Sequence, residues 1–280
     1  MSQDKIAELE EKASYIRQQV LDMCVQAGTG HVTSSFSCTE ILVALYYGGI
    51  LRYDAAKPKW EERDRFVLSK GQASPILYAV LANLGFFPES ELDRFCQADG
   101  KFGVHLQNDV PGVEITAGSL GLGFGIAAGM ALVAKMDQKP YMTFALLGDG
   151  ECYEGSIWEA AMFASHRELN NLVAIIDRNW LCVTDFTEDC VRLNPLDKKW
   201  ESYGWEVVTI NGHSFDEIFS ALEGIRSPRR NKPLLIIAET VKGKGVSFME
   251  NTPIWHGLAP KGEDAELAKQ ELKKRELSKV

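Results

Sequence analysis

The sequence lacks several features that would place the protein in common functional classes. It has no apolar run near the roughly 18 residues that a membrane-spanning helix needs. The charged opening MSQDKIAELEEK has no apolar core of the kind that a signal peptide requires. Six cysteines are scattered without CxxC spacing, which disfavours both a zinc site and a small disulfide framework. We therefore expect a cytoplasmic protein with reduced thiols and no membrane association.

Positive charge is also scarce. Lys and Arg number 30 against 39 Asp and Glu, which gives a net charge of −9 and gives nucleic-acid binding little electrostatic support. Histidine is rare as well, with only 5 in the chain, so the motif in which each histidine lies can be considered individually. A hydrophobic fraction of 45% with 25% charged residues is typical of a globular protein and argues against disorder.

Apolar runs alternate with helical stretches along the sequence. This alternation predicts an α/β fold, a doubly wound parallel sheet with helices on both faces. Apolar residues spaced three and four apart predict an amphipathic helix over residues 4–26. Four continuous apolar runs predict strands buried on both faces, at 142–147, 172–177, 205–210 and 234–240. Further helices are expected near 38–47, 120–135, 156–169, 191–203 and 215–226.

Polar residues follow two of these strands where each one ends. Gly148-Asp149-Gly150 follows the first run, and Asn179 follows the next, about thirty residues later. Ligands of doubly wound sheets bind beyond the carboxyl ends of the strands, so both side chains should project from one edge. A carboxylate and an amide oxygen suit Mg²⁺, and the glycines allow a diphosphate to approach the backbone. The alternative is an ordinary turn in which Asp149 caps the following helix.

The motif GDG followed by Asn resembles the thiamine-diphosphate motif. The surrounding sequence resembles transketolases in particular, in GDGECYEGSIWEA, RDRFVLSKGQAS (63–74), ITAGSLGLGFGIAAGMALVAK (115–135), and TVKGKGVSFMEN (240–251) with WHG (255–257). The resemblance covers about residues 5–260. It implies a thiamine diphosphate-binding domain over 1–260, followed by a charged tail or surface helix over 261–280.

The resemblance implies roles for particular residues. Asp149 and Asn179 would give side-chain oxygens, and Leu181 a backbone carbonyl, to the Mg²⁺ that holds the diphosphate of thiamine diphosphate. His31, His105 and His256 would line the channel above the cofactor, where a neutral-range imidazole can bind and exchange protons. Glu154 would link paired active sites. The other implied cofactor-binding positions are Gln72, Gly118, Leu120, Gly148, Gly150 and Lys242, although Lys242 could instead lie in a solvated loop.

One position departs from the family pattern. The motif SKGQAS carries Gln72 where the family usually has histidine. A glutamine can still form a hydrogen bond to a phosphate or hydroxyl, but it cannot carry charge or shuttle a proton. Neutral drift with an intact hydrogen bond and altered specificity both remain open.

Full-length transketolases also carry a second α/β domain, with the glutamate that activates the cofactor, and a third domain. The resemblance covers only the diphosphate-binding half. It implies the N-terminal subunit of a split transketolase, active only with a C-terminal partner subunit in an α2β2 assembly. The expected reaction moves a two-carbon ketol unit from a ketose to an aldose, with a sugar or sugar phosphate as substrate. The alternatives are another thiamine-diphosphate-dependent carboligase with a 2-oxoacid donor, and a non-catalytic subunit.

Overall fold

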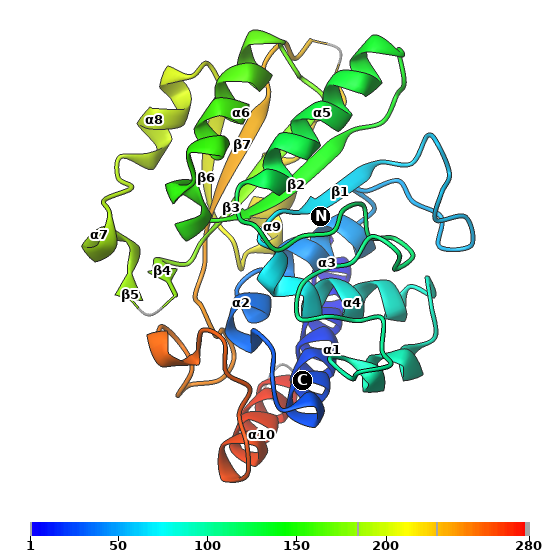
Figure 1. The fold of residues 1–280 in the computed structure, drawn as a ribbon, viewed down its shortest axis with the longest axis vertical. Helices are drawn as coiled ribbons and strands as arrows, with labels where there is room; N and C mark the ends of the chain where they lie inside the picture. The colour runs from blue at the N-terminus through cyan, green and yellow to red at the C-terminus, as the bar shows by residue number, and fades with distance from the viewer. Residues whose placement is uncertain (1, 184, 228, 278–280) are drawn as a thin grey trace.

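The structure is a computed structural model that describes residues 2–183, 185–227 and 229–277. Its centre is a five-stranded parallel sheet in the order β1-β2-β3-β7-β6. The doubly wound α/β fold predicted from the sequence is confirmed (Figure 1). The strands are β1 (Arg65–Leu68), β2 (Thr143–Gly148), β3 (Leu172–Arg178), β7 (Leu234–Glu239) and β6 (Glu206–Asn211).

Helices cover both faces of this sheet, and alternate strand residues face two separate cores. On one face Phe144 and Leu146 pack with α1, α3, α4 and α9, and on the other Ala145 and Leu147 pack with α5, α6 and α8. This two-sided burial explains why β2, β3 and β7 are continuous apolar runs in the sequence. The prediction that the run at 205–210 is also buried on both faces was wrong, because β6 is an edge strand in which only Ile210 is buried. The helices are α1 (Gln3–Ala27), α3 (Thr39–Tyr47), α4 (Ser74–Asn83), α9 (Phe215–Ala221), α5 (Leu122–Met136), α6 (Gly155–His166) and α8 (Leu196–Ser202).

Several smaller elements lie between these helices and strands. They are α2 (Val32–Phe36), the antiparallel pair of strands β4 (Leu181–Cys182) and β5 (Asp185–Phe186), and α7 (Thr187–Cys190). The helix expected over 191–203 begins only at Leu196, so that prediction was wrong at its start. Pro195 explains the difference, because the residue before a proline disfavours the helical conformation.

The last helix, α10 (Glu263–Leu277), packs against α1 and buries Ala265, Ala268 and Leu272. The boundary at residue 260 between a cofactor domain and a tail stays a prediction. No helix in the described part of the chain combines the length and the apolar character needed to cross a membrane.

Candidate active site

A cavity of about 540 Å³ opens at the carboxyl ends of β2 and β3. Parallel pairing places Gly148 beside Asp177, so the residues that follow the two strands emerge at one edge. Every site residue predicted from the sequence lines this one cavity: His31, Gln72, His105, Gly118, Leu120, Gly148, Asp149, Gly150, Glu154, Asn179, Leu181, Lys242 and His256. The structure thus brings together segments that lie far apart in the chain.

Asp149 is 1% exposed and is held by the turn that follows it and by the next strand. Its Oδ1 accepts from the backbone N–H of Gly150 at 2.8 Å, and its Oδ2 accepts from the N–H of Trp180 at 2.6 Å. Arg178 approaches the same Oδ2 at 3.3 Å and stacks on the Trp180 ring. These contacts fix the orientation of the Asp149 carboxylate in the cavity lining.

Burial raises the pKa of Asp149 to about 6, and the nearby Asp177 adds to this effect. A cation placed against this carboxylate would favour its charged form. Asn179 is also buried, and its Oδ1 accepts from the N–H of Leu181 at 3.2 Å. The oxygen atoms of Asp149, Asn179 and Leu181 are hard donors of the type that Mg²⁺ takes.

This donor set differs from a metal site built from several carboxylate, thiolate or imidazole side chains. Within residues 2–183, 185–227 and 229–277, no three His, Cys, Asp or Glu side chains gather as a metal site. The donor set expected here has one carboxylate, one amide and one carbonyl, with the remaining positions left to a diphosphate and water. Its chemistry fits Mg²⁺, and the assignment of these three ligands stays a prediction.

Backbone close to the turn is available for a diphosphate. A Cβ added to Gly118 would meet nothing within 4 Å, so the backbone of this loop is open to the cavity. At Gly150 a Cβ would lie 2.8 Å from the Cβ of Cys182, so the turn packs closely against the β4 strand. Glu151 joins the loop and the turn, because it accepts from the N–H groups of Gly121 at 2.9 Å and Gly148 at 3.0 Å.

A second part of the cavity lining, called the histidine wall below, carries the three predicted histidines. The ring centroid of His31 lies 6.1 Å from that of His105 and 5.3 Å from that of His256. The Nζ of Lys242 lies 2.7 Å from His256 Nδ1. A lysine ammonium can only donate, so His256 Nδ1 accepts, and the neutral ring keeps its proton on Nε2.

Burial sets the charge of these groups. It lowers the pKa of His31 to about 4 and that of His256 to about 3, with neighbouring cations adding to the shift. Burial, together with Lys70, also lowers the pKa of Lys242 to about 8. At pH 7 the two imidazoles are therefore neutral and Lys242 is mostly protonated. His31 Nδ1 is buried without a hydrogen-bond partner in the described chain, so it is available to a ligand.

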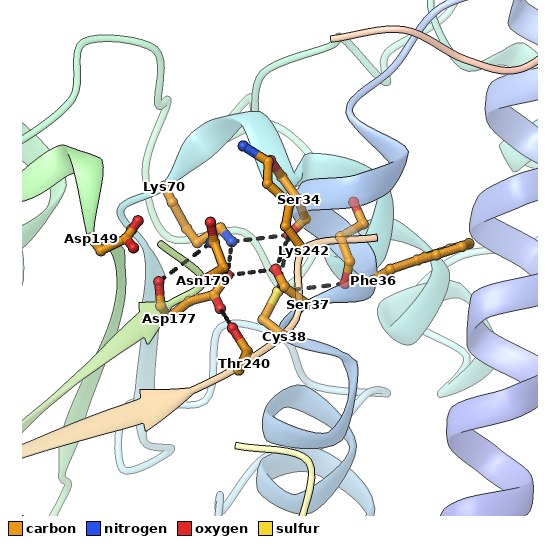
Figure 2. A network of polar contacts seen from close by, with 12 residues as sticks. Ser34, Phe36, Ser37, Cys38, Lys70, Asp149, Asp177, Asn179, Thr240 and Lys242 are labelled. Atoms are coloured by element: carbon orange, nitrogen blue, oxygen red, sulfur yellow. Dashed lines mark hydrogen bonds and ion pairs between the residues drawn. The ribbon is translucent and has the colours of Figure 1, made fainter. Parts of the chain in front are cut away.

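A buried polar network under the cavity was not predicted from the sequence. Figure 2 shows Asp177, which is fully buried and ion-paired with Lys70. Asp177 also accepts from Ser37 Oγ at 2.6 Å and from Asn179 Nδ2 at 3.2 Å, and it bonds to Thr240. Burial alone would raise the pKa of Asp177, but Lys70 and the hydroxyl donors hold it below its usual range.

Several other lining residues also escaped sequence reasoning. Lys70 lies shortly after β1 in the quoted RDRFVLSKGQAS, and Glu151 lies directly after GDG, so their positions beside motifs were the available signals. Ser34 and the pair Cys182 and Cys190 line the cavity with no local pattern to mark them. Gln72 faces the cavity, and its Oε1 is buried without a partner among the described residues.

Comparison with known proteins agrees with this architecture. The family described as "Transketolase, thiamine diphosphate binding domain" matches residues 9–276. A 6-deoxy-6-sulfo-D-fructose transketolase subunit of Clostridium sp. strain MSTE9 is 42% identical over 275 residues, which are 98% of this chain and 99% of the relative. An apulose-4-phosphate transketolase subunit of Phocaeicola vulgatus is 39% identical over 97% of this chain and 96% of the relative.

Among solved structures, the transketolase of Campylobacter jejuni superposes with a TM-score of 0.88 at 33% identity. The match covers 95% of this chain but only 42% of that one. The chain thus spans nearly the whole of relatives that are named as subunits, and about two-fifths of the Campylobacter jejuni transketolase. It belongs to the transketolase family, as the thiamine diphosphate binding domain that forms the N-terminal subunit of split transketolases.

Proposed function

We propose that this chain is the diphosphate-binding subunit of a transketolase that moves a two-carbon ketol unit from a ketose to an aldose. Thiamine diphosphate and Mg²⁺ would be its cofactors, and a sugar or sugar phosphate its substrate. The observation that carries the proposal is the cavity with oxygen donors and open glycine backbone on one wall and a histidine cluster on the other. The two named relatives, for a sulfonated sugar and a sugar phosphate, support the reaction class.

The chain's own residues would divide the work between the two walls. Asp149, Asn179 and the Leu181 carbonyl would hold Mg²⁺, and the open backbone at Gly118 would receive the diphosphate. When bound, thiamine diphosphate supplies the reactive carbon that carries the two-carbon unit. Figure 2 shows that Lys70 and Asn179, which both line the cavity, share Asp177 as an acceptor.

The histidine wall would handle the hydroxyl groups of the sugar. Lys242 fixes His256 with its proton on Nε2, so that atom can donate a hydrogen bond to substrate. His31 Nδ1 has no partner in the described chain and can donate or accept, according to its tautomer. Because the His31 ring is neutral at pH 7, its Nδ1 can take a proton from a hydroxyl and return it in the tautomer that leaves a lone pair on this atom. His256 serves as a hydrogen-bond donor instead, because its Nδ1 lone pair already accepts from Lys242. His105 completes this wall, and Glu154 lies at the rim.

A C-terminal partner chain and a second copy of this chain would complete the assembly. Exposed apolar side chains run along α5 and α6, including Leu122 at 56%, Val133 at 50% and Met162 at 56% exposure. An apolar face of this kind is typical of an interface. We propose an α2β2 assembly in which the C-terminal transketolase subunit supplies the pyrimidine-binding half. The six free cysteines suit a cytoplasmic location.

The test is to purify the native complex and compare it with the isolated 280-residue chain. Native mass spectrometry should show the partner and retained thiamine diphosphate. With added thiamine diphosphate and Mg²⁺, the complex should transfer a ketol unit from fructose 6-phosphate to ribose 5-phosphate, while the isolated chain should not. Robust turnover by the isolated chain would contradict the split assembly.

The same preparation separates the alternative carboligase. A 2-oxoacid donor would release carbon dioxide, so pyruvate is tested in parallel with the sugar phosphate. Carbon dioxide release from pyruvate without ketol transfer would overturn the proposed reaction. A complex that retains thiamine diphosphate but turns over neither donor class would indicate a binding subunit.

A further inference from the structure

Two cysteines lie side by side at the rim of the cavity. The sulfur atoms of Cys182, at the end of β4, and Cys190, at the end of α7, are 3.2 Å apart. Both residues line the cavity, and Cys190 is exposed while Cys182 is partly exposed. Cys24, Cys38 and Cys152 are instead buried. Cys182 and Cys190 therefore combine contact between two sulfur atoms with access to solvent.

The surroundings favour a bond between the two sulfurs over a metal site. A tetrahedral zinc site takes four ligands, or three with an open position. The parts of the chain that the structure describes contain no group of three His, Cys, Asp or Glu side chains placed for a metal. A disulfide needs only the two sulfurs, and these have to approach by about 1 Å to reach bonding distance. In a reducing cytosol such a bond is transient rather than structural.

We propose that Cys182 and Cys190 form a reversible disulfide that joins the end of β4 to the end of α7 at the cavity rim and slows entry of the cofactor diphosphate. The oxidant is a hydroperoxide. The exposed thiol of Cys190 reduces one hydrogen peroxide to water and becomes a sulfenic acid. The sulfur of Cys182 then attacks this sulfur, a second water leaves, and the disulfide forms. A small thiol reductant reverses the reaction by exchange.

The strand β4 and the helix α7 contact the diphosphate-binding turn directly. The Cβ of Cys182 packs against the backbone of Gly150. Tyr153, which follows that turn, donates from its hydroxyl to the Thr187 carbonyl at 2.6 Å. Arg178 reaches from Asp149 to Thr187 Oγ1 at 2.8 Å. A covalent tie between β4 and α7 therefore restricts the movement of the part of the cavity lining that the diphosphate would contact. This effect on the cofactor rests on the proposed function, whereas the bond itself does not.

The first arm of the test detects the bond in the full-length chain. The reduced protein is treated with hydrogen peroxide and digested with trypsin, which cuts after Arg178 and Arg192 and leaves both cysteines in one peptide. This peptide should lose two hydrogens, and a cut after Glu188 should leave two fragments joined until reductant is added. Cys190→Ser should abolish the link, while Cys96→Ser, at a partly exposed cysteine outside the cavity, should retain it. Thiols that remain free or oxidise only beyond sulfenic acid would overturn the proposal.

The second arm measures cofactor entry. The native complex is stripped of thiamine diphosphate and Mg²⁺, oxidised or kept reduced, and mixed with both. The oxidised sample should load cofactor several-fold more slowly, and reductant should restore the rate. Equal loading rates with the disulfide present would overturn the gating. If neither sample binds thiamine diphosphate, the proposed function fails and the gating with it, while the peptide masses still decide whether the bond forms.

Discussion

The buried ion pair between Arg17 and Glu40 is connected through His213 to the segment that carries Lys242, and its contribution to stability can be measured. Glu40 accepts from Arg17 Nη1 and Nη2, both at 2.7 Å, and its side chain is only 11% exposed. It also lies 2.8 Å from His213 Nδ1. The other ring nitrogen, His213 Nε2, accepts from the N–H of Val241 at 2.9 Å, so Nδ1 is the atom that donates to Glu40. Lys242 of the cavity directly follows Val241.

Glu40→Gln removes the charge and leaves Arg17 as a buried cation with weaker acceptors. Breaking a buried pair by removing one partner costs about 3–5 kcal/mol, and the low exposure of both side chains leaves little solvent screening to reduce it. Urea unfolding at pH 7 measures the difference. The matched control is Glu8→Gln, whose carboxylate pairs with Lys5 but is 64% exposed, and it should change stability by no more than about 0.5 kcal/mol.

The difference should also depend on pH. Burial raises the pKa of Glu40, but Arg17 and His213 outweigh burial and hold it well below its ordinary value of 4.5. A depressed pKa contributes stability that is complete above the unfolded value and is lost as the pH falls toward the folded value. The parent and Glu40→Gln should therefore differ by a constant amount from about pH 7 to about pH 5 and converge below 4.5. A variant within about 1 kcal/mol of the parent at pH 7 would refute the reasoning.

Three further predictions concern the cavity and the loop beside it. Asp149→Asn should abolish retention of thiamine diphosphate in the assembled complex, because Mg²⁺ would lose its carboxylate; unchanged affinity by isothermal titration would contradict the ligand role. Gln72→His should leave the urea midpoint unchanged and alter KM or kcat with a phosphorylated donor; identical kinetics across several donors would indicate drift. Gly121→Ala should cost about 1–3 kcal/mol in urea unfolding, because its φ of +84° is strained for alanine and the Cβ would lie 2.3 Å from Ser156 Oγ; parent-like stability would contradict this.

The sheet and the cofactor motifs could be predicted from the sequence because both have local signatures. Strands buried on two faces are apolar at every position, and the run at 172–177 shows this until its closing aspartate. Strand β1 is only four residues long, and its sequence RFVL follows a run of charged residues, so it gave no clear strand pattern. The predicted start of α8 was wrong because the apolar pattern continues on both sides of Pro195. A proline disfavours the helical conformation of the residue before it, so the helix begins only after Pro195.

The site was predicted in part, for a related reason. Asp149 and Asn179 could be placed at one edge because the carboxyl ends of parallel strands meet there. Lys70 could not be assigned a role, because its partner Asp177 is 107 positions away and nothing local marks the contact. Cys182 and Cys190 are eight positions apart, and this spacing alone does not predict that their side chains are in contact. Contacts made only by tertiary packing leave no periodic signal in the sequence.

One carboxylate relates the two walls of the cavity. Asp177 binds three segments that arrive from different parts of the chain, through Ser37, Lys70 and Thr240. These segments carry His31, six positions before its contact, and Gln72 and Lys242, each two positions after theirs. Asn179 on the metal side bonds to the same carboxylate. Since an uncompensated buried charge is costly, each partner is held against Asp177, and the spacing between the two walls is fixed with it. The polar network beneath the cavity therefore preorganises both walls before any ligand binds between them.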